Sequence, residues 1–303
     1  MRYALLCLLG FSVAAAAAPR VDHHQHLLNA PMAEPGQQPI TAESLIAMLD
    51  AAGIRRALLL SNAFRYGDPR QPSDPDEFAH VKAENDWTAG EAAKFPQRLV
   101  MYCSFNPLKD YAMAELERCA ADKRFGRGIK LQFGSSLVNL ADPAQVEQVR
   151  RVFKAANDRH LDLVVHLRVA RRLPYGAAQA QVFIDELLAA APEVKVQVAH
   201  LAGGGGGALD PAAEEVLTVF EAALARKDPR VRNLRFDLSG AVGGEGWPGR
   251  APVIARHIRA LGISRVLYGS DGGDPTDPPA KAVVAAYLQL PLTKREFRVI
   301  DRN

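Results

Sequence analysis

The chain has little of several features that would place it in other classes of protein. It has three cysteines among 303 residues, far fewer than a small disulfide-stapled scaffold uses. Its net charge is only +3, with 37 basic and 34 acidic residues, and no basic stripe indicates nucleic acid as a partner. No G-x-G-x-x-G follows the first predicted strand, and the glycine run Gly203–Gly207 lacks a following Gly-Lys-Ser/Thr. Both absences argue against a nucleotide-binding loop.

The first 18 residues have the pattern of a secretory signal. Arg2 supplies a positive n-region, Ala4–Val13 an apolar stretch, and Ala14–Ala18 the small residues of a cleavage site. This stretch is short for spanning a bilayer, so we expect no stable membrane insertion after cleavage; an uncleaved anchor is the alternative. We predict a signal peptide over residues 1–18, a single domain over 19–303, and a periplasmic or secreted location.

The rest of the chain alternates short apolar runs with segments of helical periodicity. The predicted strands are Arg20–Leu27, Arg56–Ser61, Leu99–Phe105, Gly128–Phe133, Leu161–Leu167, Lys195–Leu201, Asn233–Ser239 and Arg265–Asp271. The predicted helices are Ala42–Ala52, Val81–Lys94, Leu108–Asp122, Asp142–Arg159, Gly176–Ala191, Pro211–Arg226, Ala251–Leu261, Pro278–Leu290 and Thr293–Asp301. Eight β-then-α units predict an α/β fold, a (β/α)₈ TIM barrel with an extra C-terminal helix. A doubly wound open sheet is the alternative.

Two cysteines lie beyond the predicted signal. Cys103 falls in a predicted strand and Cys119 in the next predicted helix. An oxidising compartment would permit a bond between them, but a buried pair of free thiols is the favoured expectation.

Residues that can bind a metal ion recur at the carboxyl ends of four predicted strands. They are His24 and His26, His166, His200 and Asp271. The carboxyl ends of barrel strands meet on one face, where the chemistry of such barrels takes place. Two histidines spaced two apart on a strand share a face and can reach one cation at about 2.0–2.1 Å. A buried aspartate after an apolar run also needs a compensating cation. The sequence therefore predicts a metal site at the barrel mouth.

The same alternation assigns the other residues of the first strand. Asp22 shares the face of His24 and His26, so we expect it to orient a ligand histidine from the second coordination shell; a structural role in closing the barrel is the alternative. His23 is expected to face the helix layer.

Five segments, taken together, resemble a known family. They are Val21-Asp22-His23-His24-Gln25-His26, Gly128-Ile129-Lys130-Leu131, Val165-His166-Leu167, Val198-Ala199-His200-Leu201 and Tyr268-Gly269-Ser270-Asp271. The sequence resembles the amidohydrolase superfamily, in the amidohydrolase-related branch ("amidohydrolase 2") that includes the aminocarboxymuconate-semialdehyde decarboxylase type. The segments span nearly the whole mature chain in the expected order.

The resemblance implies one divalent cation held by His24, His26, His166 and Asp271, with zinc favoured over manganese or iron. Asp271 and His200 would be the catalytic residues: the aspartate would take the proton of a metal-activated water, and the histidine would stabilise the developing oxyanion. In binuclear members a carboxylated lysine at the end of the fourth strand bridges two metals. Lys130 lies in that strand, but the sequence does not fix which way it faces, and a second metal is disfavoured.

We therefore expect an exported metal-dependent hydrolase that cleaves an amide, lactam, lactone or ester bond in a small molecule. Non-oxidative decarboxylation is the alternative chemistry on the same site. A non-catalytic periplasmic binding protein on the same barrel is a second alternative. A homodimer is the oligomeric state that we consider for such a barrel.

Four residues at the end of a predicted strand or in the loops after the strands are candidates for substrate binding. Arg168 could pair with a substrate carboxylate through its planar guanidinium, although a surface role in the basic run 168–172 is an equally good interpretation. Gln132 and Tyr175 are weaker candidates. Trp247 lies in a glycine-rich loop that could fold over the pocket.

Overall fold

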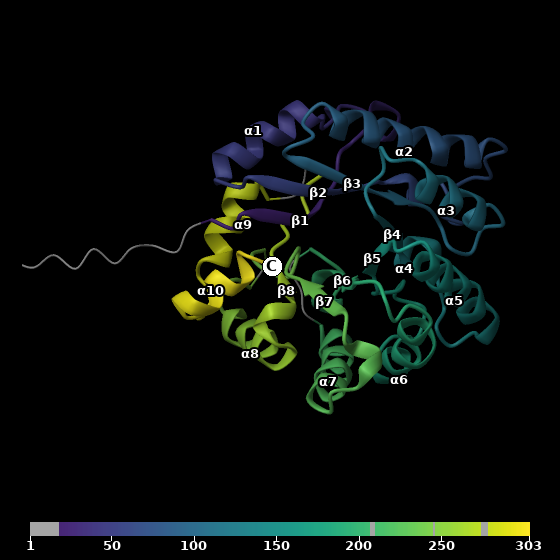
Figure 1. Ribbon diagram of the computed structural model, residues 1–303. Helices are drawn as coiled ribbons and strands as arrows, with labels where there is room; N and C mark the ends of the chain where they lie inside the picture. Colours follow the sequence, from purple (N-terminus) through teal and green to yellow (C-terminus); the bar gives the residue numbers. More distant parts are fainter. Residues whose placement is uncertain (1–17, 207–209, 245, 274–277) are drawn as a thin grey trace, which may run out of the picture.

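Eight parallel strands wind in sequence order into a barrel surrounded by helices (Figure 1). The computed structural model describes residues 18–206, 210–244, 246–273 and 278–303. The predicted signal peptide lies outside the described residues except for Ala18. In the described part of the chain, no helix is long and apolar enough to cross a membrane. The predicted (β/α)₈ barrel is confirmed.

The observed strands are shorter than the predicted ones. They are β1 (Val21–Gln25), β2 (Arg56–Leu60), β3 (Leu99–Ser104), β4 (Gly128–Gln132), β5 (Asp162–His166), β6 (Val196–Val198), β7 (Leu234–Asp237) and β8 (Val266–Leu267). Each predicted strand contains its observed counterpart, because apolar runs continue into the turns that carry the polar site residues.

The helices follow the prediction closely. They are α1 (Ala42–Ala52), α2 (Glu77–Ala93), α3 (Ala112–Ala121), α4 (Phe133–Ser136), α5 (Pro143–Asp158), α6 (Ala177–Val182), α7 (Pro211–Ala225), α8 (Ala251–Leu261), α9 (Ala280–Tyr287) and the extra C-terminal α10 (Lys294–Ile300). The predicted helix 176–191 continues beyond α6 as a π-helical segment, Phe183–Leu188, and the single turn α4 was not predicted. The bounds of α1 match because Thr41 caps its start and Gly53, at φ 76°, ends it.

Main-chain bonds between the first and last strands close the barrel. The N–H of His23 donates to the carbonyl of Tyr268 and the N–H of Asp271 to the carbonyl of His24, both over 2.9 Å. These bonds continue the pairing with β1 past Leu267, where β8 ends. They also fix Asp271 directly beside His24.

The carboxylate of Asp22 strengthens this seam. It is fully buried and accepts hydrogen bonds from the backbone N–H of His24 and of Ser270, each over 3.1 Å, and from the Ser270 hydroxyl over 2.6 Å. The carboxylate therefore contacts the backbone of His24 and joins β1 to the segment after β8, which is the alternative role of closing the barrel. Its role in orienting a ligand histidine stays a prediction. The register shift between Asp22 and Gln25 breaks the period-two alternation on which that prediction relied.

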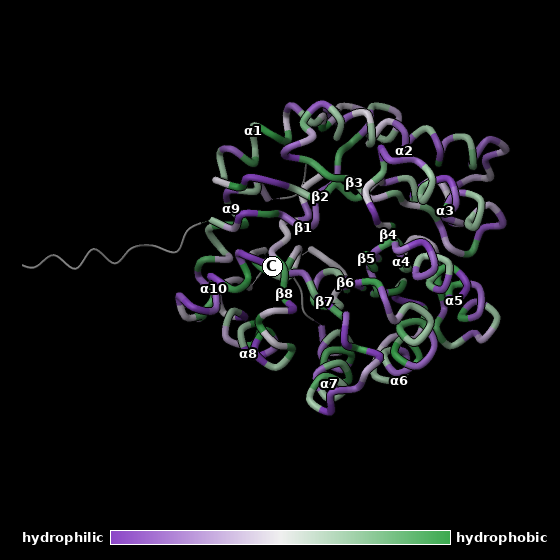
Figure 2. The backbone as a smooth tube through the Cα atoms, viewed as in Figure 1, coloured by the Kyte–Doolittle hydropathy of each residue, from purple (hydrophilic) through white to green (hydrophobic). Residues whose placement is uncertain are grey.

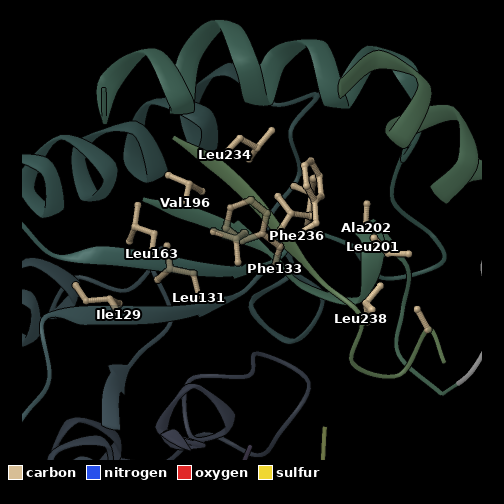
Figure 3. Packing of buried hydrophobic residues seen from close by; sticks show 14 of the residues in the cluster. Ile129, Leu131, Phe133, Leu163, Val196, Leu201, Ala202, Leu234, Phe236 and Leu238 are labelled. Carbon is tan, nitrogen blue, oxygen red and sulfur yellow. The ribbon is translucent and has the colours of Figure 1, made fainter. Parts of the chain in front are cut away.

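The hydrophobic core lies between the strands and the helices. Leu131, Leu163, Val196 and Phe236 point from neighbouring strands towards the helix layer (Figure 3), and apolar stretches run along the strands (Figure 2). The alternate residues of these strands face the barrel axis, which places polar side chains there.

His23 also faces the axis, and the prediction that it faces the helix layer is wrong. It lines a cavity with Leu58, Tyr102 and Val164, because the irregular register of β1 turns it inward. Burial lowers the pKa of His23 to about 4, so the imidazole is neutral inside the barrel.

Cys103 and Cys119 form a disulfide that joins β3 to α3. The expectation of free thiols is wrong. The strand and the following helix pack together closely enough for the bond, with Cα atoms 6.2 Å apart.

Breaking this bond should destabilise the fold. The cysteines are separated by 16 positions, so loss of the cross-link is expected to lower the free energy of unfolding by about 2–4 kcal/mol. Urea unfolding with and without a thiol reductant measures the change. The double variant Cys103→Ser, Cys119→Ser should show the lower stability and no response to reductant; equal stability of the oxidised and reduced protein would contradict the expectation.

Candidate metal centre

The barrel brings the predicted metal-binding residues together at its mouth. Nε2 of His24 lies 3.3 Å from Nε2 of His26 and 3.3 Å from Oδ1 of Asp271. Nε2 of His26 lies 3.9 Å from the same carboxylate oxygen. Donor atoms at about 2.1 Å from a tetrahedral ion lie about 3.4 Å apart. The spacing of these three residues therefore fits one cation.

The hydrogen bonds of the Nδ1 atoms determine which ring nitrogens keep a free lone pair. Nδ1 of His24 lies 3.1 Å from Asp237 Oδ2, Nδ1 of His26 lies 2.7 Å from the Leu60 carbonyl, and Nδ1 of His200 lies 2.9 Å from the Ser239 carbonyl. Each partner is an acceptor, so each Nδ1 carries the proton and each Nε2 keeps a lone pair.

Lone pairs that face one another repel unless a cation lies between them. The Nε2 atoms of His24 and His26 meet at 3.3 Å beside a carboxylate oxygen, and hydrogen bonding between them would need a proton on one ring. A divalent cation satisfies all three donors. The residues therefore fit the metal that the resemblance implies.

His166 and His200 lie on the other side of this group. The ring of His200 is 4.8 Å from that of His24 and 4.7 Å from that of His166, between centroids. His24, His200 and Asp271 each offer a donor atom, and these atoms lie within 4.8 Å of one another. His200, which was predicted to act on water or substrate, therefore lies as near the shared donor atoms as the predicted ligands do. The His166 ring lies on the far side of His200 from His24.

The surroundings keep the imidazoles neutral and the aspartate charged. Burial lowers the pKa of His24 and of His166, and it lowers the pKa of His26 to about 3, with the neighbouring His24 adding to the shift. Burial alone would raise the pKa of Asp271, but the electrostatic effect of the surrounding basic side chains, His200, His24, His26 and Lys130, outweighs it and holds that pKa below its usual value. Neutral imidazole and ionised carboxylate are the states that bind a metal.

Lys130 points into the barrel, which settles the facing that the sequence left open. Its side chain is 1% exposed, and its Nζ lies 3.1 Å from Nε2 of His24. Burial lowers the pKa of this amine to about 8, which eases the deprotonation that carboxylation or metal contact requires. The bridging role stays a prediction.

Asp237, at the end of β7, is the residue that sequence reasoning missed. Its buried carboxylate contacts Nδ1 of His24, accepts from the backbone N–H of His200 over 3.0 Å, and accepts from the Ser239 hydroxyl over 2.5 Å and from the Gln197 amide over 2.6 Å. It thereby supports His200, which adopts a left-handed conformation at φ 57°. An aspartate closing the run Leu234-Arg235-Phe236 could have been recognised by the same strand-end argument that found Asp271.

The glycine run after His200 covers the site closely. A Cβ on Gly205 would lie 3.3 Å from Oδ2 of Asp271, and the residue has φ +75°. Gly204 and Gly205 also line the neighbouring pocket. The glycines let the backbone pass against the donor residues; Gly207 lies outside the described residues.

That pocket holds two of the four predicted substrate residues. It has a volume of about 390 Å³ and is lined by His166, Gln132, Arg168 and also Arg70 and Arg171. Gln132 Oε1 accepts from the Ser135 N–H over 2.7 Å. The Arg168 guanidinium pairs with Asp210 at 3.0 Å.

The other two predicted substrate residues lie outside the lining of this pocket. The Tyr175 ring lies 4.6 Å beneath the Arg168 guanidinium, and its hydroxyl donates to the Ala202 carbonyl, so it holds Arg168 in place. Trp247 is tied through Nε1 to Gln289 Oε1 at 3.0 Å. The structure therefore does not support a Trp247 lid over this pocket.

Comparison with known proteins assigns the family. The family model described as amidohydrolase matches residues 21–297, a span that includes all the residues of the metal centre. The chain belongs to the amidohydrolase family. No curated protein matches this amidohydrolase significantly.

Solved structures of low identity share the fold. The 2,6-dihydroxybenzoate decarboxylase from Rhizobium is 17% identical, with a TM-score of 0.65 over 93% of this chain and 96% of its own. A probable 2-pyrone-4,6-dicarboxylic acid hydrolase from Acinetobacter baumannii, with citric acid bound, is 16% identical, with a TM-score of 0.58 over 93% and 96%. An amidohydrolase from Burkholderia multivorans with bound zinc is 15% identical, with a TM-score of 0.60 over 93% and 96%.

Asp237→Asn should weaken metal binding in this amidohydrolase. An amide accepts more weakly than a carboxylate from Nδ1–H of His24, which lowers the basicity and fixed orientation of that ring, so we expect affinity to fall about 10–100-fold. Competition with a chromophoric chelator for zinc measures it. Asp158→Asn, at the exposed end of α5, is the control, and unchanged affinity in Asp237→Asn would refute this role.

Two neighbouring glycines allow a matched test of the loop. Gly205→Ala and Gly206→Ala both place a side chain at positive φ, so each should cost about 1 kcal/mol of stability. Only Gly205→Ala brings a Cβ against Asp271, because a Cβ on Gly206 meets nothing within 4 Å. We expect weaker zinc binding in Gly205→Ala alone; equal losses of affinity in both variants would show that the contact with Asp271 is unimportant.

Proposed function

We propose that this amidohydrolase is a metal-dependent hydrolase that cleaves an amide, lactam, lactone or ester bond in a small carboxylate-bearing molecule. The observation that carries the proposal is the convergence of the Nε2 lone pairs of His24 and His26 on the Asp271 carboxylate, with His166 and His200 alongside. Such an arrangement is costly in a buried site unless a cation occupies it.

One divalent cation, with zinc favoured, fits the donors best. Imidazole nitrogens and a carboxylate oxygen suit zinc, and also manganese or iron, and a similar structure carries zinc. When bound, the ion supplies Lewis-acid activation of water and of the substrate carbonyl. The ligands in this proposal are His24, His26, His166 and Asp271.

Asp271 is the proposed proton acceptor. Its side chain is 25% exposed, whereas those of His24 and His200 are 0% and 3% exposed, so it is the donor that incoming water and substrate meet first. Its low pKa keeps it ionised for accepting a proton from the attacking water, and it can pass that proton to the leaving group.

The hydrogen bonds of His200 define how it can act. Because Nδ1 donates to the Ser239 carbonyl, the neutral ring presents a lone pair at Nε2. It can therefore ligate or accept a proton, and it can donate to an oxyanion only after it is protonated.

The arginine-lined pocket supports a substrate that carries a carboxylate. Arg70, Arg168 and Arg171 line it beside His166 and Asp210. Arg70 pairs with Asp68 and Arg168 with Asp210, whereas Arg171 has no ion pair among the described residues and could bind a carboxylate in a bidentate manner. Citric acid is bound in the similar hydrolase structure.

Decarboxylation is the second candidate reaction. An arginine that holds a carboxylate next to the donor residues is also what a decarboxylase requires, and a similar structure is that of a 2,6-dihydroxybenzoate decarboxylase. We further propose export to an oxidising compartment. The signal-like residues 1–18 and the Cys103–Cys119 disulfide support it.

The decisive experiment compares the metal-loaded wild type with Asp271→Asn on a substrate panel. Metal analysis should give about one zinc, manganese or iron per chain; a ratio near two would support the Lys130 bridge. We expect turnover of carboxylated lactones, esters or amides by the wild type and at least a 10³-fold loss in Asp271→Asn, because that variant cannot accept the proton. Release of CO₂ from carboxylated phenols instead would establish decarboxylation.

The control variant is checked for metal content as well as for activity. Asp158→Asn should retain full activity and full metal content. Undiminished activity in Asp271→Asn would refute the proton-transfer role, and a metal-loaded wild type that converts neither class of substrate would favour a binding protein.

A further inference from the structure

The opposite end of the barrel holds a second concave site, rich in positive charge. A cavity of about 570 Å³ opens between the segments that precede β6, β7 and β8 and the end of the described chain. Five of its nine lining residues are basic, and no aspartate or glutamate side chain lines it: Lys195, Arg232, Arg235, Arg265 and Arg302. Asn303, the last described residue, also lines it. We call it the floor cavity. Such clustering stands out in a chain whose charges are otherwise mixed.

Two of the five cations are held by the protein itself. The guanidinium of Arg265 donates to the carbonyls of Val231, Arg232 and Leu234 over 2.8–3.3 Å. The Arg232 side chain donates to the Pro192 carbonyl over 2.9 Å and lies 3.7 Å from Glu193. These contacts fix the walls of the cavity.

The other three, Lys195, Arg235 and Arg302, have no ion pair or side-chain hydrogen bond within the described ranges of the chain. Arg235 is the most confined, because β7 alternates and Leu234 and Phe236 face the helix layer. Its side chain therefore enters the barrel from below. A half-buried guanidinium without a counter-ion is unfavourable, and the charge of Arg235 adds to burial in lowering the pKa of Arg265.

The floor cavity continues upward along the barrel axis. A second chamber of about 190 Å³ shares Lys195, Arg235 and Asn303 with it and reaches His23 and Tyr102. One acid, Asp162, lines this upper chamber, and its Oδ1 accepts from the Lys195 backbone N–H over 2.9 Å. Figure 1 shows the end of the chain beside β8, near the barrel centre.

We propose that the floor cavity binds a small oxyanion with at least two negative charges, such as a phosphate ester or a di- or tricarboxylate. Three unpaired cations around a concave space match the charge of such a group, and guanidinium forks match its oxygen geometry. The volume suits a small molecule. This site is separate from the metal centre, so the proposal does not depend on the proposed reaction.

The test is calorimetric titration of the purified full chain with inorganic phosphate and, separately, with citrate, at constant ionic strength. The test variant is Lys195→Gln with Arg302→Gln, since both side chains are exposed at the rim and hold no structural contact within the described residues. We expect at least a tenfold loss of affinity for one or both anions. Arg235→Gln should give the same loss and provides a second, independent variant.

Two controls separate this site from general charge effects and from the barrel mouth. Lys123→Gln with Arg151→Gln removes the same net charge from exposed positions elsewhere, and Arg168→Gln removes an arginine of the mouth pocket; both should bind as the wild type does at the floor. Preference for phosphate over citrate would identify phosphate esters as the ligand class, and the reverse preference would identify polycarboxylates. Equal binding in the floor variants, or an equal loss in the surface control, would overturn the proposal.

Discussion

The structure depends on the meeting of several electron-pair donors at one point of the barrel mouth. The Nε2 atoms of His24 and His26 approach each other and the Asp271 carboxylate at 3.3 Å. Their outer nitrogens are already committed to acceptors, so none of these donors can relieve the others by hydrogen bonding. The Lys130 amine reaches only His24 Nε2, over 3.1 Å, whereas a divalent cation among the donors would satisfy all of them, and this links the fold to metal-dependent chemistry.

The rest of the mouth maintains this geometry. Asp22 holds the backbone of β1 against the segment after β8, which keeps His24 beside Asp271. Asp237 orients the ring of His24 and the backbone of His200 together. Gly205 packs over Asp271, where a Cβ would lie only 3.3 Å from Oδ2. Buried polar groups that each have partners form a rigid site that is prepared for its ligand.

The two ends of the barrel use charge in opposite ways. At the mouth, buried carboxylates and neutral imidazoles create a demand for a cation. At the floor, the positive charges of Lys195, Arg235 and Arg302 favour a bound anion. Arg235 and Asp237 lie two residues apart on β7, so both face the barrel interior, and their different heights along the strand place Arg235 nearer the floor and Asp237 nearer the mouth. The barrel therefore separates two sites of opposite polarity along one axis.

The sequence by itself determined the (β/α)₈ fold and placed His24, His26, His166, His200 and Asp271 on one face, because apolar runs of regular spacing end in polar residues. Tertiary structure determined the side-chain orientations and long-range contacts that this pattern does not predict. The irregular register of β1 turned His23 inward and placed the Asp22 carboxylate on the backbone N–H groups of His24 and Ser270. The approach of α3 to β3 joined Cys103 to Cys119, and the inward face of β4 brought Lys130 to His24. These outcomes depend on contacts between distant segments, which local periodicity does not encode.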